Sequence, residues 1–87
     1  ALTWFMLGSE LLRAKRDAEA AEALRRSLEL KPVQPAAARL LGDALRRLNR
    51  TSDAREAYEN AIRLAEATGD LQVAKEARVF LAKLKEG

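Results

Sequence analysis

The chain has 87 residues, with no cysteine and no histidine. Disulfide bonds and ordinary zinc sites are therefore excluded as supports for its small core. Its net charge of +3 is too small to require a nucleic-acid or membrane partner. Alanine, leucine, arginine, glutamate and lysine dominate the composition, and because these residues favour helices we expect an all-α domain held together by helix packing alone.

The first half of the chain predicts two helices followed by a break. A first helix is expected over residues 1–15, because apolar side chains recur there at helical spacing. That apolar face carries Trp4, Leu7, Gly8 and Leu11. Asp17 is the expected N-cap of a second helix, which ends near residue 30. Pro32 cannot continue that helix, and Pro35 suits the first turn of the next one.

The second half predicts three more helices. The third is expected over residues 35–48. The fourth meets no proline and should therefore continue to about Thr68, and the fifth should span residues 71–85. The expected capping residues are Thr51 or Ser52 at the start of the fourth helix, Gly69 at its end and Asp70 before the fifth.

Residues 7–30 recur, shifted by 34 positions, as residues 41–64. The matches include Leu7-Gly8 with Leu41-Gly42, Leu11 with Leu45, Ala20 with Ala54, and Leu30 with Leu64. Repetition at a fixed period of this size is typical of stacked helical repeats. A glycine inside a helix costs about 0.5 to 1 kcal/mol relative to alanine. Because that cost occurs twice at the same phase, we expect Gly8 and Gly42 to mark close contacts between helices.

These residues resemble the tetratricopeptide repeat, a pair of antiparallel helices. The first repeat matches its signature at Trp4, Leu7, Gly8, Leu11, Ala20, Leu24, Ser27 and Pro32. The second matches at Leu41, Gly42, Leu45, Ala54, Tyr58 and Ala61, but has Ala38 in place of the family's Trp and Glu66 in place of its Pro. The resemblance implies a right-handed α-solenoid of five helices. It forms one domain over residues 1–87, with repeats over about 1–34 and 35–69 and a last helix over about 70–86.

The last helix departs from the strict period. A 34-residue shift would place Lys75-Glu76 in the buried Leu-Gly position, whereas a 40-residue shift places Leu81-Ala82 there. We therefore expect the 40-residue register. The helix then either caps the stack or begins a third repeat, and its wide apolar face favours a further element packing on it.

Two aromatic residues are expected in the core. Trp4 and Tyr58 occupy core positions of the repeat, with the Tyr58 hydroxyl reaching the surface. Basic groups end the first and third helices, where cations complement the helix dipole. The favourable pair Asp43–Arg47 adds to this pattern. We therefore favour a structural role for the basic groups over an acidic or nucleic-acid partner, and expect neither nucleic-acid binding nor membrane insertion.

Catalysis has no support in the sequence. The chain lacks a cysteine nucleophile and a histidine base, and its carboxylates are interleaved with arginine at helical spacing, as on solvated helix faces. No glycine-rich phosphate loop is present. We expect no catalytic residue, no cofactor and no metal.

The resemblance implies protein–protein interaction. In this family the first helix of each repeat lines a concave groove that binds an extended peptide or a helix. Carried over to this chain, the partner-binding residues are Phe5, Ser9, Leu12, Arg39, Asp43 and Arg46. Leu2 also falls on this face, as do Glu76, Val79 and Lys83 in the 40-residue register. The hypothesis is a partner segment whose apolar anchor packs on Phe5 and Leu12, while its carboxylates pair with Arg39 and Arg46.

One known specificity of the family is not expected. Members that grip the acidic C-terminal tails of chaperones use cationic and amide side chains at positions that match Phe5, Ser9, Leu40, Glu76 and Phe80 here. The strict register would substitute Asp70 and Ala74 for the last two. Neither register supplies the cationic clamp, so we predict that the chain does not bind such tails.

The alternative is a structural role. Repeat fragments expose apolar end faces, so the chain could instead self-associate into a homo-oligomer or act as a spacer in a longer solenoid. The absence of a visible targeting segment favours the cytoplasm. The chain starts at Ala1, inside a helical pattern, and its alanine and arginine usage fits a GC-rich bacterial source. We therefore expect a fragment of a larger bacterial protein.

Overall fold

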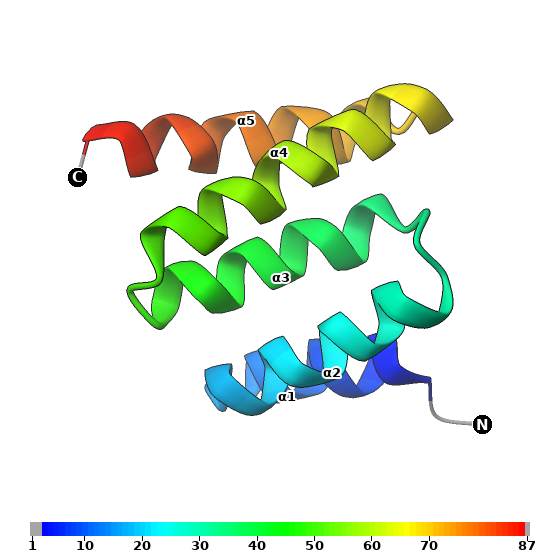
Figure 1. Ribbon diagram of the computed structural model, residues 1–87, viewed down its shortest axis with the longest axis vertical. Helices are drawn as coiled ribbons and strands as arrows, with labels where there is room; N and C mark the ends of the chain where they lie inside the picture. The colour runs from blue at the N-terminus through cyan, green and yellow to red at the C-terminus, as the bar shows by residue number, and fades with distance from the viewer. Residues whose placement is uncertain (1–2, 87) are drawn as a thin grey trace.

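The computed structural model describes residues 3–86, and over that range the chain forms five helices and no strand. They are α1 (Trp4–Arg13), α2 (Asp17–Leu30), α3 (Pro35–Arg47), α4 (Thr51–Thr68) and α5 (Leu71–Glu86). The helices stack in chain order, each running back along its predecessor, with α1 and α5 at opposite ends of the stack (Figure 1). The expected all-α helical repeat is confirmed.

The stack has two different faces, because not every pair of helices is in contact. Each helix packs on the next one in the chain, and α3 also contacts both α1 and α5. Within the described residues, α2 and α4 make no such contact. The odd-numbered helices therefore converge on one side of the molecule, while α2 and α4 diverge on the other. We call the surface of α1, α3 and α5 the inner face and the surface of α2 and α4 the outer face.

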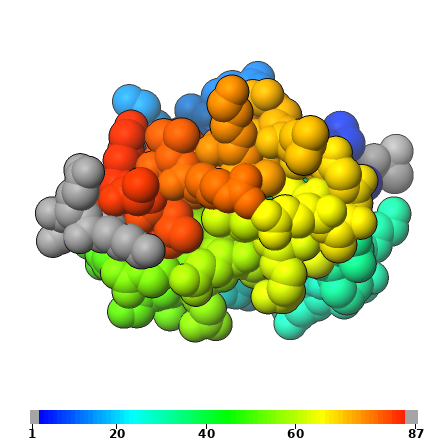
Figure 2. Space-filling model, turned by 90° about the horizontal axis from the view of Figure 1, so that it is seen from above, coloured from blue at the N-terminus to red at the C-terminus, as the bar shows by residue number. Residues whose placement is uncertain are grey.

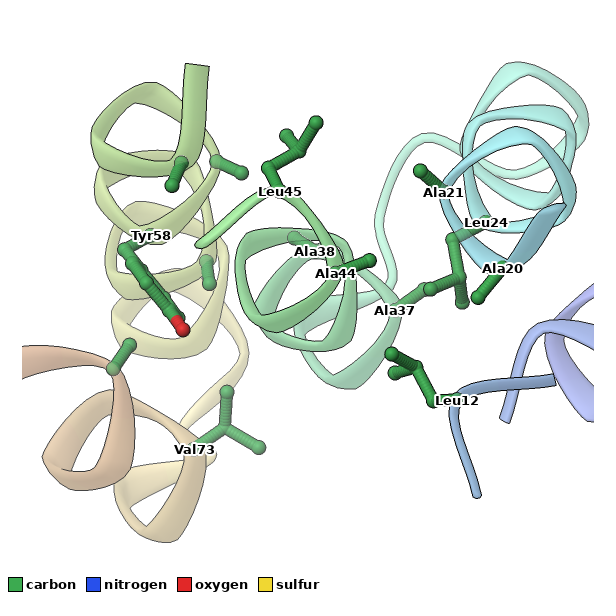
Figure 3. Packing of buried hydrophobic residues seen from close by; sticks show 14 of the residues in the cluster. Leu12, Ala20, Ala21, Leu24, Ala37, Ala38, Ala44, Leu45, Tyr58 and Val73 are labelled. Atoms are coloured by element: carbon green, nitrogen blue, oxygen red, sulfur yellow. The ribbon is translucent and has the colours of Figure 1, made fainter. Parts of the chain in front are cut away.

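The core is built mainly from alanine, so the helices approach closely. Tyr58 and Leu24 are the largest fully buried side chains, and each fills the space opposite a glycine. A Cβ added at Gly8 would lie 2.6 Å from Leu24 Cγ, and one at Gly42 would lie 2.6 Å from Tyr58 Cε1. The two repeated glycines thus mark the close helix contacts that the sequence predicts. Figure 3 shows Leu24 and Tyr58 among the buried side chains.

The starts of α1, α2 and α4 differ from prediction by one to three residues. Thr3 is extended and caps α1 by accepting the Met6 N–H at Oγ1, so the helix begins at Trp4 and not at residue 1. Residues 1 and 2 lie outside the described range. The predicted caps Asp17 and Thr51 are instead the first residues of α2 and α4.

The physical reason is the turn that precedes each of these helices. Lys15 and Asn49, which are 34 positions apart, have positive φ angles of 63° and 62°. The left-handed residue reverses the chain, and Arg16 and Arg50 then occupy the N-cap positions without a capping hydrogen bond from their side chains. Each turn is closed by the cap's own backbone N–H, which donates to a carbonyl five residues earlier (Arg16 to Leu11, 2.8 Å; Arg50 to Leu45, 2.9 Å).

The residues that begin α3, end α4 and cap α5 agree with prediction. Pro35 opens α3 at its first turn. Gly69 ends α4 in the left-handed conformation with φ 79°, and Asp70 Oδ1 accepts the Val73 N–H at 3.2 Å. The longer α4 therefore ends where glycine allows it.

The register of α5 corrects the prediction. Val73 and Ala74 are buried like Ala37 and Ala38, and α5 begins at Leu71 as α3 begins at Pro35, an offset of 36 positions. The 34-residue alternative would place exposed Gln72, and the preferred 40-residue register would place exposed Arg78, where Ala38 is buried, so both fit the start of α5 less well. The 40-residue register differs by only about one helical turn and so shares much of the same face.

The uncovered side of α5 is mostly polar, contrary to the expected wide apolar face. Its buried and partly buried side chains turn toward α3 and α4. Its exposed residues are Leu71, Gln72, Lys75, Arg78, Val79, Ala82 and Lys83. Figure 2 views the stack from this end and shows α5 lying beside α4. A polar exposed side is typical of the terminal element of a repeat stack.

Candidate functional site

Three of the predicted site residues lie together on the inner face. Arg39, Asp43 and Arg46 occupy successive turns of α3, so their side chains share one side of the helix. Arg39 Nη1 donates to Asp43 Oδ2 at 3.0 Å, and Arg46 Nη2 lies 3.7 Å from Asp43 Oδ1. Asp43 is buried, and the two guanidinium groups provide the opposite charge that a buried carboxylate requires.

Tyr58 completes this cluster from α4. Sequence reasoning placed its hydroxyl at the surface, but the residue is fully buried and its hydroxyl donates to Asp43 Oδ1 at 2.5 Å. The same hydroxyl accepts a hydrogen bond from Arg46 Nε at 3.2 Å. Burial raises the pKa of Tyr58 far above its usual value, and the hydrogen bond to Asp43 raises it further. The phenol therefore acts as a neutral donor at physiological pH.

Helix α5 adds an aromatic ring and two charges. The Phe80 ring stacks on Tyr58 with centroids 5.8 Å apart, and the Arg46 guanidinium carbon lies 4.8 Å from the Phe80 centroid. Lys83 Nζ is 5.4 Å from the same centroid. Arg39 Nε and Glu76 Oε1 form an ion pair at 3.3 Å. Arg46 is thus held by Tyr58, Asp43 and Phe80, yet its side chain remains 34% exposed.

The three predicted residues of α1 are placed unequally. Phe5 and Ser9 are partly exposed. Leu12 is only 7% exposed and packs in the core, so the prediction that it would contact a partner's anchor is wrong. Figure 3 shows Leu12 among the buried side chains that gather where α1, α2 and α3 meet. Leu2, which was assigned to the same face, lies outside the described residues.

Arg47 does not form the predicted pair with Asp43. Because Asp43 turns toward Tyr58 and Arg39, Arg47 points back toward the first repeat. There Arg47 Nη1 donates to the Leu12 carbonyl at 3.1 Å and lies 3.4 Å from Asp17 Oδ1. This interaction links the C-terminal end of α3 to the turn between α1 and α2.

Trp4 was predicted in the core, but its side chain is 42% exposed. It is the first residue of α1 and is therefore only partly covered by the rest of the stack. The Arg26 guanidinium lies 6.0 Å from its ring centroid. Trp4 borders a hollow of about 420 Å³ at the N-terminal edge of the stack. The residues that line it are Thr3, Trp4, Phe5, Ser27, Leu30, Lys31 and Gln34.

A second hollow lies on the outer face, between α2 and α4. Its volume is about 380 Å³. Leu41 and Leu45 of α3 contribute to its lining, together with Ala57 and charged residues of α2 and α4. The residues are Arg25, Leu41, Leu45, Asp53, Glu56, Ala57, Glu59, Asn60 and Arg63. Neither hollow was predicted from the sequence.

The Asp43–Tyr58 contact was also missed, although the repeat carries a signal for it. Asp43 stands where the first repeat has Ser9, and Tyr58 stands where it has Leu24. A tyrosine in a buried repeat position needs a hydrogen-bond partner, and a buried aspartate needs a donor. The joint change at these two positions therefore indicates that the side chains meet.

The described residues hold neither a metal-binding group nor a membrane span. No three histidine, cysteine, aspartate or glutamate side chains gather there in an arrangement that could hold a metal ion. No helix in that range combines the length and apolar character that crossing a bilayer requires.

Comparison with known proteins assigns the chain to a family. The family model described as "Tetratricopeptide repeat" matches residues 5–70 and again residues 39–84. A TPR repeat-containing protein of Pseudomonas aeruginosa is 40% identical over 84 residues, which cover 97% of this chain and 80% of that protein. The chain belongs to the tetratricopeptide repeat family, whose repeats are generally protein–protein interaction modules and typically non-catalytic.

Solved structures agree with this assignment. A Bordetella parapertussis protein, known from its solution structure, superposes with a TM-score of 0.87 at 32% identity, covering 95% of this chain and 72% of that one. The crystal structure of a tetratricopeptide repeat domain protein from Salinibacter ruber gives a TM-score of 0.86 at 24% identity, covering 94% and 91% of the two chains. The second likeness shows the fold alone.

Proposed function

We propose that the chain binds a peptide or helix of a partner protein across its inner face. The observation that carries this proposal is the state of Arg46, which is fixed by Tyr58, Asp43 and Phe80 but is still one-third exposed. A guanidinium that is already oriented loses less conformational entropy when it pairs with a partner's carboxylate. Phe5 and Ser9 extend the same face along α1, and Glu76 does so along α5.

The cations that remain exposed on the inner face indicate which side chains a partner should carry. Arg39 is largely occupied by Asp43 and Glu76, so Arg46 and Lys83 are the cations of this cluster that remain for a partner. We propose a segment with one or two acidic side chains. The chaperone-tail specificity is not proposed, because Phe5, Ser9 and Leu40, with Gln72 and Glu76 at the 36-position offset of α5, supply no cation at the positions of the clamp.

The test is selection of binders from a random peptide library, followed by titration of the strongest peptide with Arg46→Ala. We expect affinity to fall about tenfold or more, because a hydrogen bond to a charged group contributes about 1.5–3 kcal/mol. Arg39 stays in place to neutralise Asp43, so the variant should remain folded. Replacing both arginines would leave the buried carboxylate uncompensated and is not a clean test.

Arg63→Ala is the matched control, because Arg63 lies on α4 at the outer face and its side chain contacts only Asn60 among the described hydrogen-bonded partners. Its affinity for the selected peptide should stay within about twofold of the unsubstituted chain. Equal losses in the two variants would contradict binding across the inner face.

Self-association is a second candidate, favoured by the exposure of Trp4, Met6 and Leu30 at the N-terminal end. The exposed side of α5 is mostly polar, which disfavours self-association through the C-terminal end of the stack. Sedimentation of the isolated chain separates the candidates. Dimers that form with rising concentration support self-association, and a monomer at all concentrations contradicts it.

A further inference from the structure

The hollow at the N-terminal edge gathers the most exposed apolar surface of the first repeat. Leu30, at the end of α2, is 70% exposed, and Trp4 and Phe5 lie across from it on α1. Met6 and Val33 are also exposed in the neighbouring segments. Single exposed apolar residues are common on protein surfaces, but a grouping around one hollow indicates a contact site. Tryptophan in particular is enriched among the residues that dominate binding energy.

The polar groups of the hollow already have partners. Gln34 Nε2 donates to the carbonyl oxygens of Ser27 and Lys31, both at 2.7 Å. Ser27 Oγ donates to Gln34 Oε1 at 3.1 Å. The side chain of Gln34 thereby fastens the turn between α2 and α3 to the end of α2. The wall is held in shape, and an apolar side chain could enter without leaving these groups unpaired.

The charged side chain among the described residues that line the hollow is cationic. Lys31 lines it, and the Arg26 guanidinium lies over the Trp4 ring. Among the described residues that line the hollow, none is acidic. A basic segment would therefore meet repulsion here, whereas carboxylates beside an inserted apolar side chain would find two cations.

We propose that this hollow takes a large apolar side chain of the partner, flanked by acidic residues. The inference rests on the proposed peptide-binding function and names the anchor that Leu12, being buried, does not contact. Phe5 belongs to both surfaces, so one extended segment can place its apolar residue in the hollow and continue along the inner face toward Arg46.

Trp4 makes the hollow directly observable because it is the only tryptophan in the chain. The probe is the peptide acetyl-Glu-Glu-Leu-Phe-Glu-Glu-amide, titrated into the chain while Trp4 emission is recorded. We expect a saturable blue shift as the exposed ring is covered. The peptide with lysine in place of every glutamate should bind at least about tenfold more weakly, and raising the salt concentration should reduce this difference. Equal binding of the two peptides would overturn the charge assignment.

Leu30→Glu and Leu71→Glu form a matched pair. Both residues are highly exposed, at 70% and 75%, so neither substitution should unfold the chain, but only Leu30 lines the hollow. We expect Leu30→Glu to weaken the glutamate peptide at least about tenfold and Leu71→Glu to leave it within about twofold. Similar affinities for the two variants would overturn the proposal. So would a blue shift of Trp4 that grows with protein concentration in the absence of peptide, since the hollow would then hold a second copy.

The library-selected peptide separates this inference from the function on which it rests. If Arg46→Ala weakens that peptide and Leu30→Glu does not, the anchor site is wrong and binding across the inner face stands. If neither substitution weakens it, both proposals fall. Losses from both substitutions support the two together.

Discussion

Gly42 is the residue at which one added methyl group should disturb the packing most. Its missing Cβ would meet three atoms of the Tyr58 ring at 2.6–2.9 Å, and that ring is fully buried with its hydroxyl bonded to Asp43 and Arg46. We expect Gly42→Ala to lower the free energy of unfolding by about 1–3 kcal/mol. Thermal unfolding followed by circular dichroism measures the effect, with a drop of about 4–8 °C for each kcal/mol in a domain of this size.

Ala82→Gly supplies the scale for this comparison. Ala82 is exposed in the interior of α5, so its replacement reports only the helix preference of alanine over glycine, about 0.5–1 kcal/mol. On preference alone, Gly42→Ala would stabilise the chain by that amount. A higher unfolding temperature for Gly42→Ala would therefore contradict the close contact between α3 and α4.

Tyr58 should make stability depend on alkaline pH. Burial and the Asp43 hydrogen bond hold its pKa in the folded state far above the usual value of 10.0 for tyrosine. The contribution to stability is complete below pH 10 and is lost as the pH rises toward the folded pKa, because only the unfolded chain releases the proton there. The slope should approach about 1.4 kcal/mol per pH unit. Urea unfolding at several pH values above 9 measures it.

Tyr58→Phe isolates that contribution from the other groups that titrate at high pH. The variant should be less stable near neutral pH, because Asp43 loses a donor, and its stability should fall less steeply above pH 10. Tyr58 is the chain's only tyrosine, so phenolate absorbance follows its ionisation directly. A folded-state midpoint near 10 would show that the hydroxyl is not held as described.

At the scale of the elements, the two repeated turns hold non-glycine residues in the left-handed conformation. Lys15 and Asn49 both have positive φ, which costs most L-residues about 1–2 kcal/mol but asparagine less. We expect Lys15→Gly to stabilise the chain by about 0.5–1 kcal/mol and Asn49→Gly to gain less, as measured by thermal unfolding.

Lys31→Gly is the control for this pair. Lys31 also follows a helix, but its φ of −136° is extended and accessible to any residue. Glycine there adds only flexibility to the unfolded chain, so the variant should not be stabilised. A gain equal to that of Lys15→Gly would contradict the strain assigned to the turns.

Element ends were predictable wherever a residue type dictates the backbone. Pro35 and Gly69 fix the start of α3 and the end of α4 because their allowed φ angles are special. The starts of α2 and α4 were misplaced by one residue, since the left-handed Lys15 and Asn49 carry no comparable sequence signal. The register of α5 was misjudged because the Leu-Gly motif is absent there and only burial reveals the offset.

At the scale of the whole molecule, the 34-residue repetition was enough to predict the stack of helices. Exposure was harder to predict, because it depends on what lies next to a residue outside its own repeat. Trp4 occupies a core position of the repeat but opens the first described helix, and so remains partly uncovered. Arg39, Asp43 and Arg46 were assigned to one face of α3 because the family resemblance implied it, and their mutual ion pairs were not predicted. The contacts that Tyr58 and Phe80 add to this cluster could not be predicted, because they depend on how α3, α4 and α5 pack together.

We expect a partner peptide to contact the odd-numbered helices and not the outer face. Backbone amide chemical shifts, recorded by NMR while the library-selected peptide is added, test this directly. We expect the largest changes on the inner face, around Phe5, Ser9, Arg46 and Glu76. Changes confined to the groove between α2 and α4, around Arg25, Glu56 and Asn60, would contradict it.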